Sequence, residues 1–111
     1  MEREEFEQVV ENVVTTLPDF IRKKLQNIEI VIEDEPVIHK SLLGLYQGVP
    51  LKNRGHWYGN VMPDRITLFK KNIERISRSE EDLKQWIHRV IIHEIGHYFG
   101  FDEDGLRKSG Y

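Results

Sequence analysis

Apolar side chains recur every three or four positions near the start of the chain, which is the spacing of an amphipathic helix. This stretch covers residues 3–16. Its apolar positions are Phe6, Val9, Val10, Val13 and Val14. Pro18 ends or restarts the helix, because proline fits only the first turn. Residues 19–25 are expected to form a further turn or two.

Two shorter stretches have the composition of β-strands. Residues 28–32 read Ile-Glu-Ile-Val-Ile and residues 66–69 read Ile-Thr-Leu-Phe. Such β-branched runs predict strands with a buried face. Residues 42–51 contain two glycines and a proline, which is typical of a loop or an irregular edge strand. Residues 52–60 are expected to be a loop and residues 72–76 a connecting helical turn.

The longest helix is predicted near the end of the chain. Ser79 and Asp82 have the spacing of a capping box that opens a helix, and Gly100 can stop one. The residues between them include the apolar positions Ile91, Ile92, Ile95 and Phe99. These four fall on one side of the helix and are expected to pack into the core.

Composition and charge narrow the classes of function. The 111 residues fit one compact domain, residues 1–111. The absence of cysteine excludes disulfides, thiolate metal sites and cysteine nucleophiles. A formal net charge of −3 gives no general attraction to nucleic acid or to anionic membranes. No apolar run approaches the ~20 residues that span a bilayer, and the acidic start lacks a signal-peptide pattern. A cytoplasmic location is the default expectation.

The strongest chemical signal is the pattern His93-Glu94-Ile95-Gly96-His97. On a helix the two histidines stand one turn apart and differ by about 40° around the axis. Two imidazoles in this arrangement can meet one tetrahedral metal ion, for which zinc is the expected cofactor. Glu94 lies about 100° from His93, on the flank of the same face, where its carboxylate can reach a metal-bound water. The competing interpretation is that both histidines are hydrogen-bonded core residues.

A zinc site usually needs a third protein ligand. Gly100 can adopt a positive φ and fold the following residues back toward the imidazoles. Glu103 is the first choice for the third ligand, and Asp102 and Asp104 are alternatives. Whichever of these acidic residues do not bind are expected to form an acidic cap on the loop.

Three stretches together resemble the small bacterial zincin-like metallopeptidases: HEIGHYFGFDEDGLR, GLYQGVPL and PDRITLF. The resemblance implies a single-domain, soluble α+β fold in which a small mixed sheet packs against an N-terminal helix and a long C-terminal active-site helix. It also implies that His93 and His97 bind zinc, that Glu94 is the catalytic base, and that an acidic residue after Gly100 completes the site. The motif is similar to the start of the metzincin signature, but Glu103 stands where that signature has its last histidine.

These features predict a zinc-dependent metallopeptidase in which Glu94 acts as general base toward a zinc-activated water. The alternative is a metal-binding regulatory or interaction module with little or no turnover. The expected partner is a peptide or unfolded protein, held as an extended strand along a sheet edge at residues 45–51 or 66–69. Because the chain is small, walls of the cleft are expected from residues 42–60 or from a partner, either a second copy or another protein.

Other side chains are weaker candidates. His88 is expected to be a surface or packing residue, His39 stands alone, and His56 is expected to be a loop residue that could line a groove. Trp86 is expected to shield the site from solvent or to pack under the loop. Tyr98 and Tyr111 could stabilise an oxyanion, although packing for Tyr98 and a frayed terminus for Tyr111 are the favoured interpretations.

Overall fold

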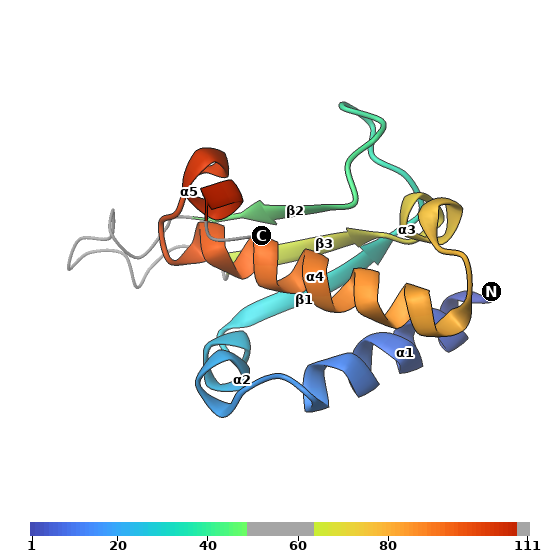
Figure 1. Cartoon of the computed structure of the whole chain (residues 1–111), viewed down its shortest axis with the longest axis horizontal. Coiled ribbons are helices and arrows are strands. Elements are labelled where there is room, and N and C mark those ends of the chain that lie inside the picture. Colours follow the sequence, from blue (N-terminus) through green and yellow to red (C-terminus); the bar gives the residue numbers. More distant parts are fainter. Residues whose placement is uncertain (49–63, 109–111) are drawn as a thin grey trace.

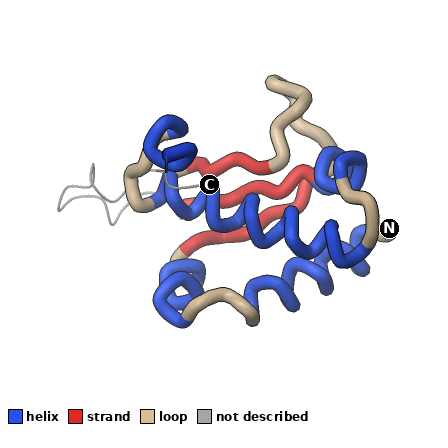
Figure 2. Tube along the Cα trace, viewed as in Figure 1, coloured by secondary structure: helices blue, strands red, loops and turns tan. Residues whose placement is uncertain are grey.

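A computed structural model describes residues 1–48 and 64–108 and contains a three-stranded sheet with helices packed against it (Figures 1 and 2). The strands are β1 (Ile28–Glu33), β2 (Gly44–Gln47) and β3 (Asp64–Phe69), in the order β1-β3-β2. β1 runs parallel to β3, and β2 runs antiparallel to it. The sheet is therefore mixed, and the fold is α+β as predicted.

The described residues form five helices: α1 (Arg3–Thr15), α2 (Asp19–Leu25), α3 (Lys70–Ile76), α4 (Glu80–Tyr98) and α5 (Glu103–Lys108). α4 packs against β2 and β3, and α1 packs against α4 (Figure 1). None of the helices within the described ranges has both the length and the apolar character that crossing a membrane requires.

The core lies between the sheet and the long helix α4. Ile66 and Leu68 of β3 are fully buried, as are Ile87 and Ile91 of α4. Phe6 of α1 joins them at 0% exposure. Each such side chain contributes roughly 1.5–3 kcal/mol through the area it removes from water. This packing makes α4 a rigid support for the side chains on its other face.

The start of α4 is fixed by the predicted cap. The Ser79 hydroxyl oxygen accepts a hydrogen bond from the Asp82 N–H at 3.1 Å. The Asp82 carboxylate accepts one from the backbone N–H of Arg78 at 2.9 Å. Glu80, Glu81 and Asp82 also place negative charge at the positive end of the helix dipole.

Two expectations about the elements are wrong. Residues 66–69 are not a sheet edge, because β3 lies between β1 and β2 and pairs with both. Residues 103–108 form helix α5 rather than a loop. The edge strand expected within residues 42–51 is observed as β2. Residues 49–51 lie outside the described residues. So does the loop expected at 52–60, which includes His56.

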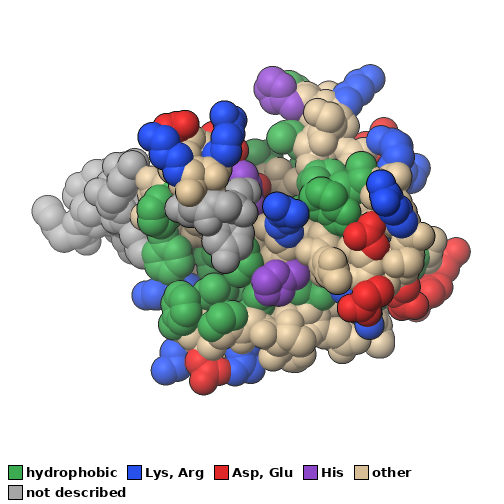
Figure 3. All heavy atoms as spheres, in the orientation of Figure 1, with side chains coloured by type: hydrophobic (Ala, Val, Ile, Leu, Met, Phe, Trp, Pro, Cys, Tyr) green, Lys and Arg blue, Asp and Glu red, His purple; other side chains and the backbone are tan. Residues whose placement is uncertain are grey.

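The surface carries both signs of charge. On the face drawn in Figure 3, Lys and Arg side chains are interspersed with Asp and Glu side chains, and hydrophobic side chains gather toward the end of the molecule that carries α2. Several ion pairs among the described residues are exposed, such as Arg3 with Glu7 and Lys108 with Asp104. Pairs of this kind contribute ~0–1 kcal/mol each.

Candidate metal centre

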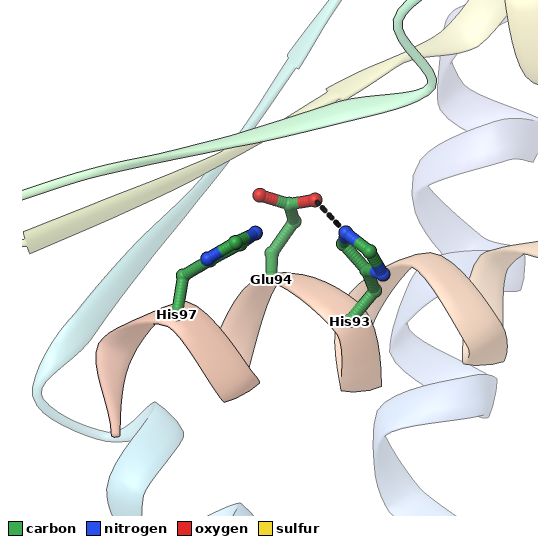
Figure 4. Close-up of side chains that lie close together, drawn as sticks. All are labelled: His93, Glu94 and His97. Carbon is green, nitrogen blue, oxygen red and sulfur yellow. Dashed lines mark ion pairs between the residues drawn. The ribbon is translucent and has the colours of Figure 1, made fainter. Parts of the chain in front are cut away.

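His93, Glu94 and His97 project from the same side of α4, toward β2 (Figure 4). One ligand atom from each lies within 4.8 Å of the others. The two imidazole rings are 5.2 Å apart between centroids and are inclined at 75°. Helical periodicity therefore places the three groups as predicted, while Ile91 and Ile95 on the other side of the helix are buried.

The end of α4 turns the chain back toward these side chains. Gly100 has φ +97°, a backbone conformation that glycine adopts without strain. The Phe101 N–H donates to the Gly96 carbonyl at 3.0 Å, and the Gly100 N–H donates to the His97 carbonyl at 2.9 Å. This pair of bonds is the Schellman motif that commonly ends helices at a glycine. It sends the following residues back across the last turn of α4.

Glu103, the first residue of α5, reaches both imidazoles. Its Oε1 atom lies 3.1 Å from His93 Nε2 and 2.8 Å from His97 Nε2. Its side chain is 65% exposed, so the three atoms meet at the surface of a cleft. The two other acidic residues considered for this position have different contacts. Asp102 accepts a hydrogen bond from the Gly105 N–H at 2.7 Å, and Asp104 pairs with Lys108 at 3.2 Å.

A contact between α4 and α5 holds Glu103 at this position. Leu106 of α5 is buried at 4% exposure and lies directly over Gly96. A Cβ atom on residue 96 would stand only 2.3 Å from the Leu106 Cδ2 atom. Gly96 therefore does more than fill a variable position of the histidine motif, because its missing side chain lets α5 approach the helix that carries both histidines.

The donor set fits a zinc ion. Two imidazole nitrogens and one carboxylate oxygen are common zinc ligands, at ~2.0–2.2 Å from the metal. Tetrahedral geometry at that length separates neighbouring ligand atoms by roughly 3.3 Å, close to the two distances from Glu103. In addition, His97 Nδ1 lies 2.9 Å from the Phe101 carbonyl oxygen, which can only accept. Nδ1 therefore donates to this carbonyl, which leaves Nε2 as the ring nitrogen that can give up its proton and bind a metal.

Glu94 differs from Glu103 in environment. It is 7% exposed, and its Oε1 atom accepts a hydrogen bond from the Tyr46 N–H at 2.8 Å. Its Oε2 atom lies 3.9 Å from His93 Nε2, farther than the Glu103 oxygen. Glu94 and the two histidines form a group that could hold a metal, but these distances favour Glu103 as the third ligand and leave Glu94 beside the metal position.

The two carboxyl groups also differ in pKa. Burial raises the pKa of Glu94, and the nearby histidines and the Tyr46 N–H only partly oppose that effect. For Glu103 burial also acts to raise the pKa, but hydrogen bonds from His93 and His97 outweigh it and the pKa is lowered. Glu103 therefore stays ionised, as a metal ligand must, whereas Glu94 has a greater tendency to hold a proton.

Strand β2 approaches α4 closely enough to hold Glu94. A Cβ atom on Gly44 would lie 2.5 Å from Val90 and 3.4 Å from the Glu94 Cγ atom. The Tyr46 side chain is fixed as well, because its hydroxyl donates to Asp64 at 2.9 Å and its ring meets that of Tyr98 edge-on at 6.1 Å. The roles of Gly44 and Tyr46 were not predicted from the sequence, because a backbone N–H donor has no sequence signature.

The other candidate residues have the following positions. Tyr98 is 4% exposed and packs in the core, as favoured. His88 is exposed outside the site, against α1, and His39 is exposed with φ +56°. Trp86 lines the cavity that contains the two histidines. Tyr111 lies outside the described residues.

Comparisons with known proteins bear on the family and the fold. A family model described as zincin-like metallopeptidase matches residues 25–111. The fold is similar to that of a conserved hypothetical protein from Thermus thermophilus, with a TM-score of 0.61 and 19% sequence identity over 97% of this chain and 99% of the other. No curated protein matches the chain.

Proposed function

Because the chain belongs to the zincin-like metallopeptidase family, we propose that it is a zinc-dependent peptidase that hydrolyses peptides or flexible protein segments. His93, His97 and Glu103 would hold the metal, and Glu94 would act as general base. The observation that supports this proposal is the difference between the two glutamates. Glu103 lies between the imidazoles in an exposed position, whereas Glu94 is buried beside them and held by a backbone donor.

A purely structural zinc has no use for a buried carboxylate beside it. Structural sites usually close all four positions with Cys or His, whereas catalytic sites keep three protein ligands and one open position. A bound zinc ion would supply a Lewis acid that polarises the scissile carbonyl and brings the pKa of a coordinated water to ~7.

Glu94 is placed to move the protons. The Tyr46 N–H fixes its Oε1 atom, so the carboxylate is oriented with Oε2 near His93. In this proposal Glu94 removes a proton from the attacking water and later delivers it to the leaving amine. Burial suits this role because it raises the pKa of the carboxyl group toward neutral pH, where a general base transfers protons most effectively.

A peptide substrate fits the cleft beside β2. The cavity has a volume of about 770 Å³ and lies between β2, α4 and the segment that follows Gly100. The Leu43 carbonyl accepts from the Phe69 N–H of the neighbouring strand. Because pairing alternates along antiparallel strands, the backbone groups of Gly44 and Tyr46 point to the other edge of β2. The Tyr46 N–H is already bonded to Glu94, so an extended peptide would add to that edge through the Gly44 backbone groups, with main-chain bonds for affinity and side-chain pockets for specificity.

The experiment compares zinc-loaded wild type with Glu94→Gln on a mixed peptide library, with mass spectrometry to identify new termini. Wild type should release zinc-dependent fragments that a chelator abolishes and that the variant does not release. If wild type and variant are equally inert while both retain zinc, the peptidase proposal fails and the metal-binding interaction module is the better account.

A further inference from the structure

One wall of the cavity carries a cationic side chain that the hydrolytic chemistry does not use. Arg89 is the only Lys or Arg among the described residues that line the cavity. Its Cζ atom lies 5.7 Å from the centre of the Trp86 ring, within the range of a cation–π contact. No ion pair with Arg89 is found within residues 1–48 and 64–108.

The position of Arg89 on α4 brings it into line with the metal-binding residues. Trp86, Arg89, His93 and His97 follow one stripe of the helix, because spacings of three and four residues return to the same face. Arg89 precedes His93 by one turn, ~6 Å along the axis. The acidic residues that line the cavity are Glu94 and Glu103, beside the two histidines, and Asp102, at the end where α4 meets α5. Arg89 therefore makes the end before His93 the basic end of the cavity, and Asp102 lies at the opposite end.

The direction of a bound peptide decides which of its residues meets the basic end. β2 and α4 run the same way along the cavity, since Gly44 lies against Val90 while Tyr46, two residues later, bonds to Glu94 (Figure 1). A peptide that adds to β2 in the more stable antiparallel arrangement runs opposite to both. Its C-terminal part then extends toward Arg89. At ~3.3 Å per extended residue, Arg89 faces the second or third residue after the scissile bond.

We propose that Arg89 is a specificity-determining residue that binds a carboxylate located two or three residues after the scissile bond. This inference rests on the proposed peptidase function and adds the class of substrate. The planar guanidinium can bind a carboxylate through two parallel hydrogen bonds, and Trp86 orients it for that contact. The carboxylate can come from an Asp or Glu side chain or from the free C-terminus of a short peptide. On the opposite side of the scissile bond a carboxylate would meet Asp102, and no Lys or Arg among the described residues that line the cavity.

The first test uses zinc-loaded wild type and Arg89→Gln on matched libraries with free and with amidated C-termini. Wild type should cut preferentially where Asp or Glu is the second or third residue after the bond, or two or three residues before a free C-terminus. Preference in the amidated library identifies a side-chain carboxylate, and preference restricted to the free library identifies the terminal one. In Arg89→Gln the ratio of cleavage at acidic sites to cleavage at neutral sites should fall by about three- to tenfold. This is the range expected of a partly exposed charge-assisted contact.

The matched control is Arg78→Gln, which removes an exposed arginine outside the cavity. It should leave the preference unchanged. Fragments that appear with no acidic preference, or a preference that survives in Arg89→Gln, would overturn the inference and leave the peptidase proposal intact. The absence of any zinc-dependent fragment would count instead against the peptidase proposal.

A binding measurement keeps the inference testable without turnover. Zinc-loaded Glu94→Gln is titrated calorimetrically with three hexapeptides: acetyl-Ala-Leu-Gly-Leu-Gln-Ala-amide, the same peptide with Glu in place of Gln, and the first peptide with a free carboxylate. At least one carboxylate-bearing peptide should bind about three- to tenfold tighter than the neutral one, and adding Arg89→Gln should remove the difference. Equal binding of all three, or no binding of any, would contradict the inference.

Discussion

The contact between Gly96 and Leu106 provides a way to move Glu103 without substituting any of the three proposed metal ligands. In Gly96→Ala the new Cβ atom would stand 2.3 Å from Leu106 Cδ2. Since carbon atoms pack at roughly 3.5–4.0 Å, Leu106 must retreat by about 1.2 Å or more. Leu106 is buried, so this movement is transmitted to α5. Glu103 lies one turn earlier on the same helix, and its oxygen shifts with it.

A shift of about 1 Å is several times larger than the ~0.2 Å tolerance of a zinc–ligand distance. We therefore expect Gly96→Ala to weaken zinc binding by about 10- to 100-fold, the loss typical of a ligand that is no longer oriented. The metal-free protein should change little in stability. Alanine gains up to ~1 kcal/mol of helix propensity over glycine, which offsets part of the overlap with Leu106.

The assay is competition with a chelating dye for zinc affinity, with urea unfolding in chelator for metal-free stability. Gly105→Ala is the matched control, because a Cβ atom there meets only the Asp102 and Phe101 side chains at 3.2 Å or more. Adding Leu106→Ala to Gly96→Ala should restore part of the zinc affinity by making room. If Gly96→Ala binds zinc within about threefold of wild type, the leucine adapts by rotation and the reasoning about α5 is refuted.

Four further predictions concern the proposed ligands and base. His93→Ala should lose zinc and the rise in melting temperature that zinc gives wild type, as measured by metal analysis and calorimetry; equal zinc content in the variant would contradict the site. Glu103→Gln should weaken zinc binding by about tenfold or more in the dye assay, whereas Asp104→Asn should not. Glu94→Gln should retain zinc and lose hydrolysis by about 100-fold or more. Burial raises the pKa of Glu94 above its ordinary value of 4.5. Just above pH 4.5 the native state of the metal-free protein therefore binds more protons than the unfolded state. Wild type should lose stability in that range, relative to Glu94→Gln, as the pH rises. Parallel pH profiles of the free energy of unfolding would show that Glu94 is not desolvated.

The part of the site that the sequence predicts depends on helical periodicity alone. His93 and His97 are four residues apart within a capped helix, so any regular α4 brings their rings to one side. Glu94 next to His93 follows from the same geometry. No knowledge of the rest of the fold was needed for these positions.

The choice among Asp102, Glu103 and Asp104 could not be made in the same way. It depends on where α5 begins, since Asp102 accepts from the Gly105 N–H while Glu103 points back to α4. It also depends on the approach of Leu106 to Gly96. A contact between two helices that meet through a missing side chain has no local pattern in either segment.

The central position of β3 in the sheet had a signal in the sequence, although residues 66–69 were expected to be a possible sheet edge. Residues 66–69 are apolar or β-branched at every position, and all four are buried. A strand covered on both faces and paired on both edges tolerates such a run. Residues 28–32 alternate with a glutamate, as suits the outer strand β1. The hydrogen bond from the Tyr46 N–H to Glu94 had no comparable signal, because every residue except proline carries that donor.

The central claim is that two imidazoles and one carboxylate hold a single zinc ion with a position left open. Diffraction from zinc-loaded crystals on both sides of the zinc absorption edge tests it directly. We predict one anomalous peak at ~2.0–2.2 Å from His93 Nε2, His97 Nε2 and a Glu103 oxygen, with a solvent molecule as the fourth neighbour and Glu94 within hydrogen-bond reach of it. A map with no peak between the two rings would contradict the account, and so would a peak whose four positions are all filled by protein atoms.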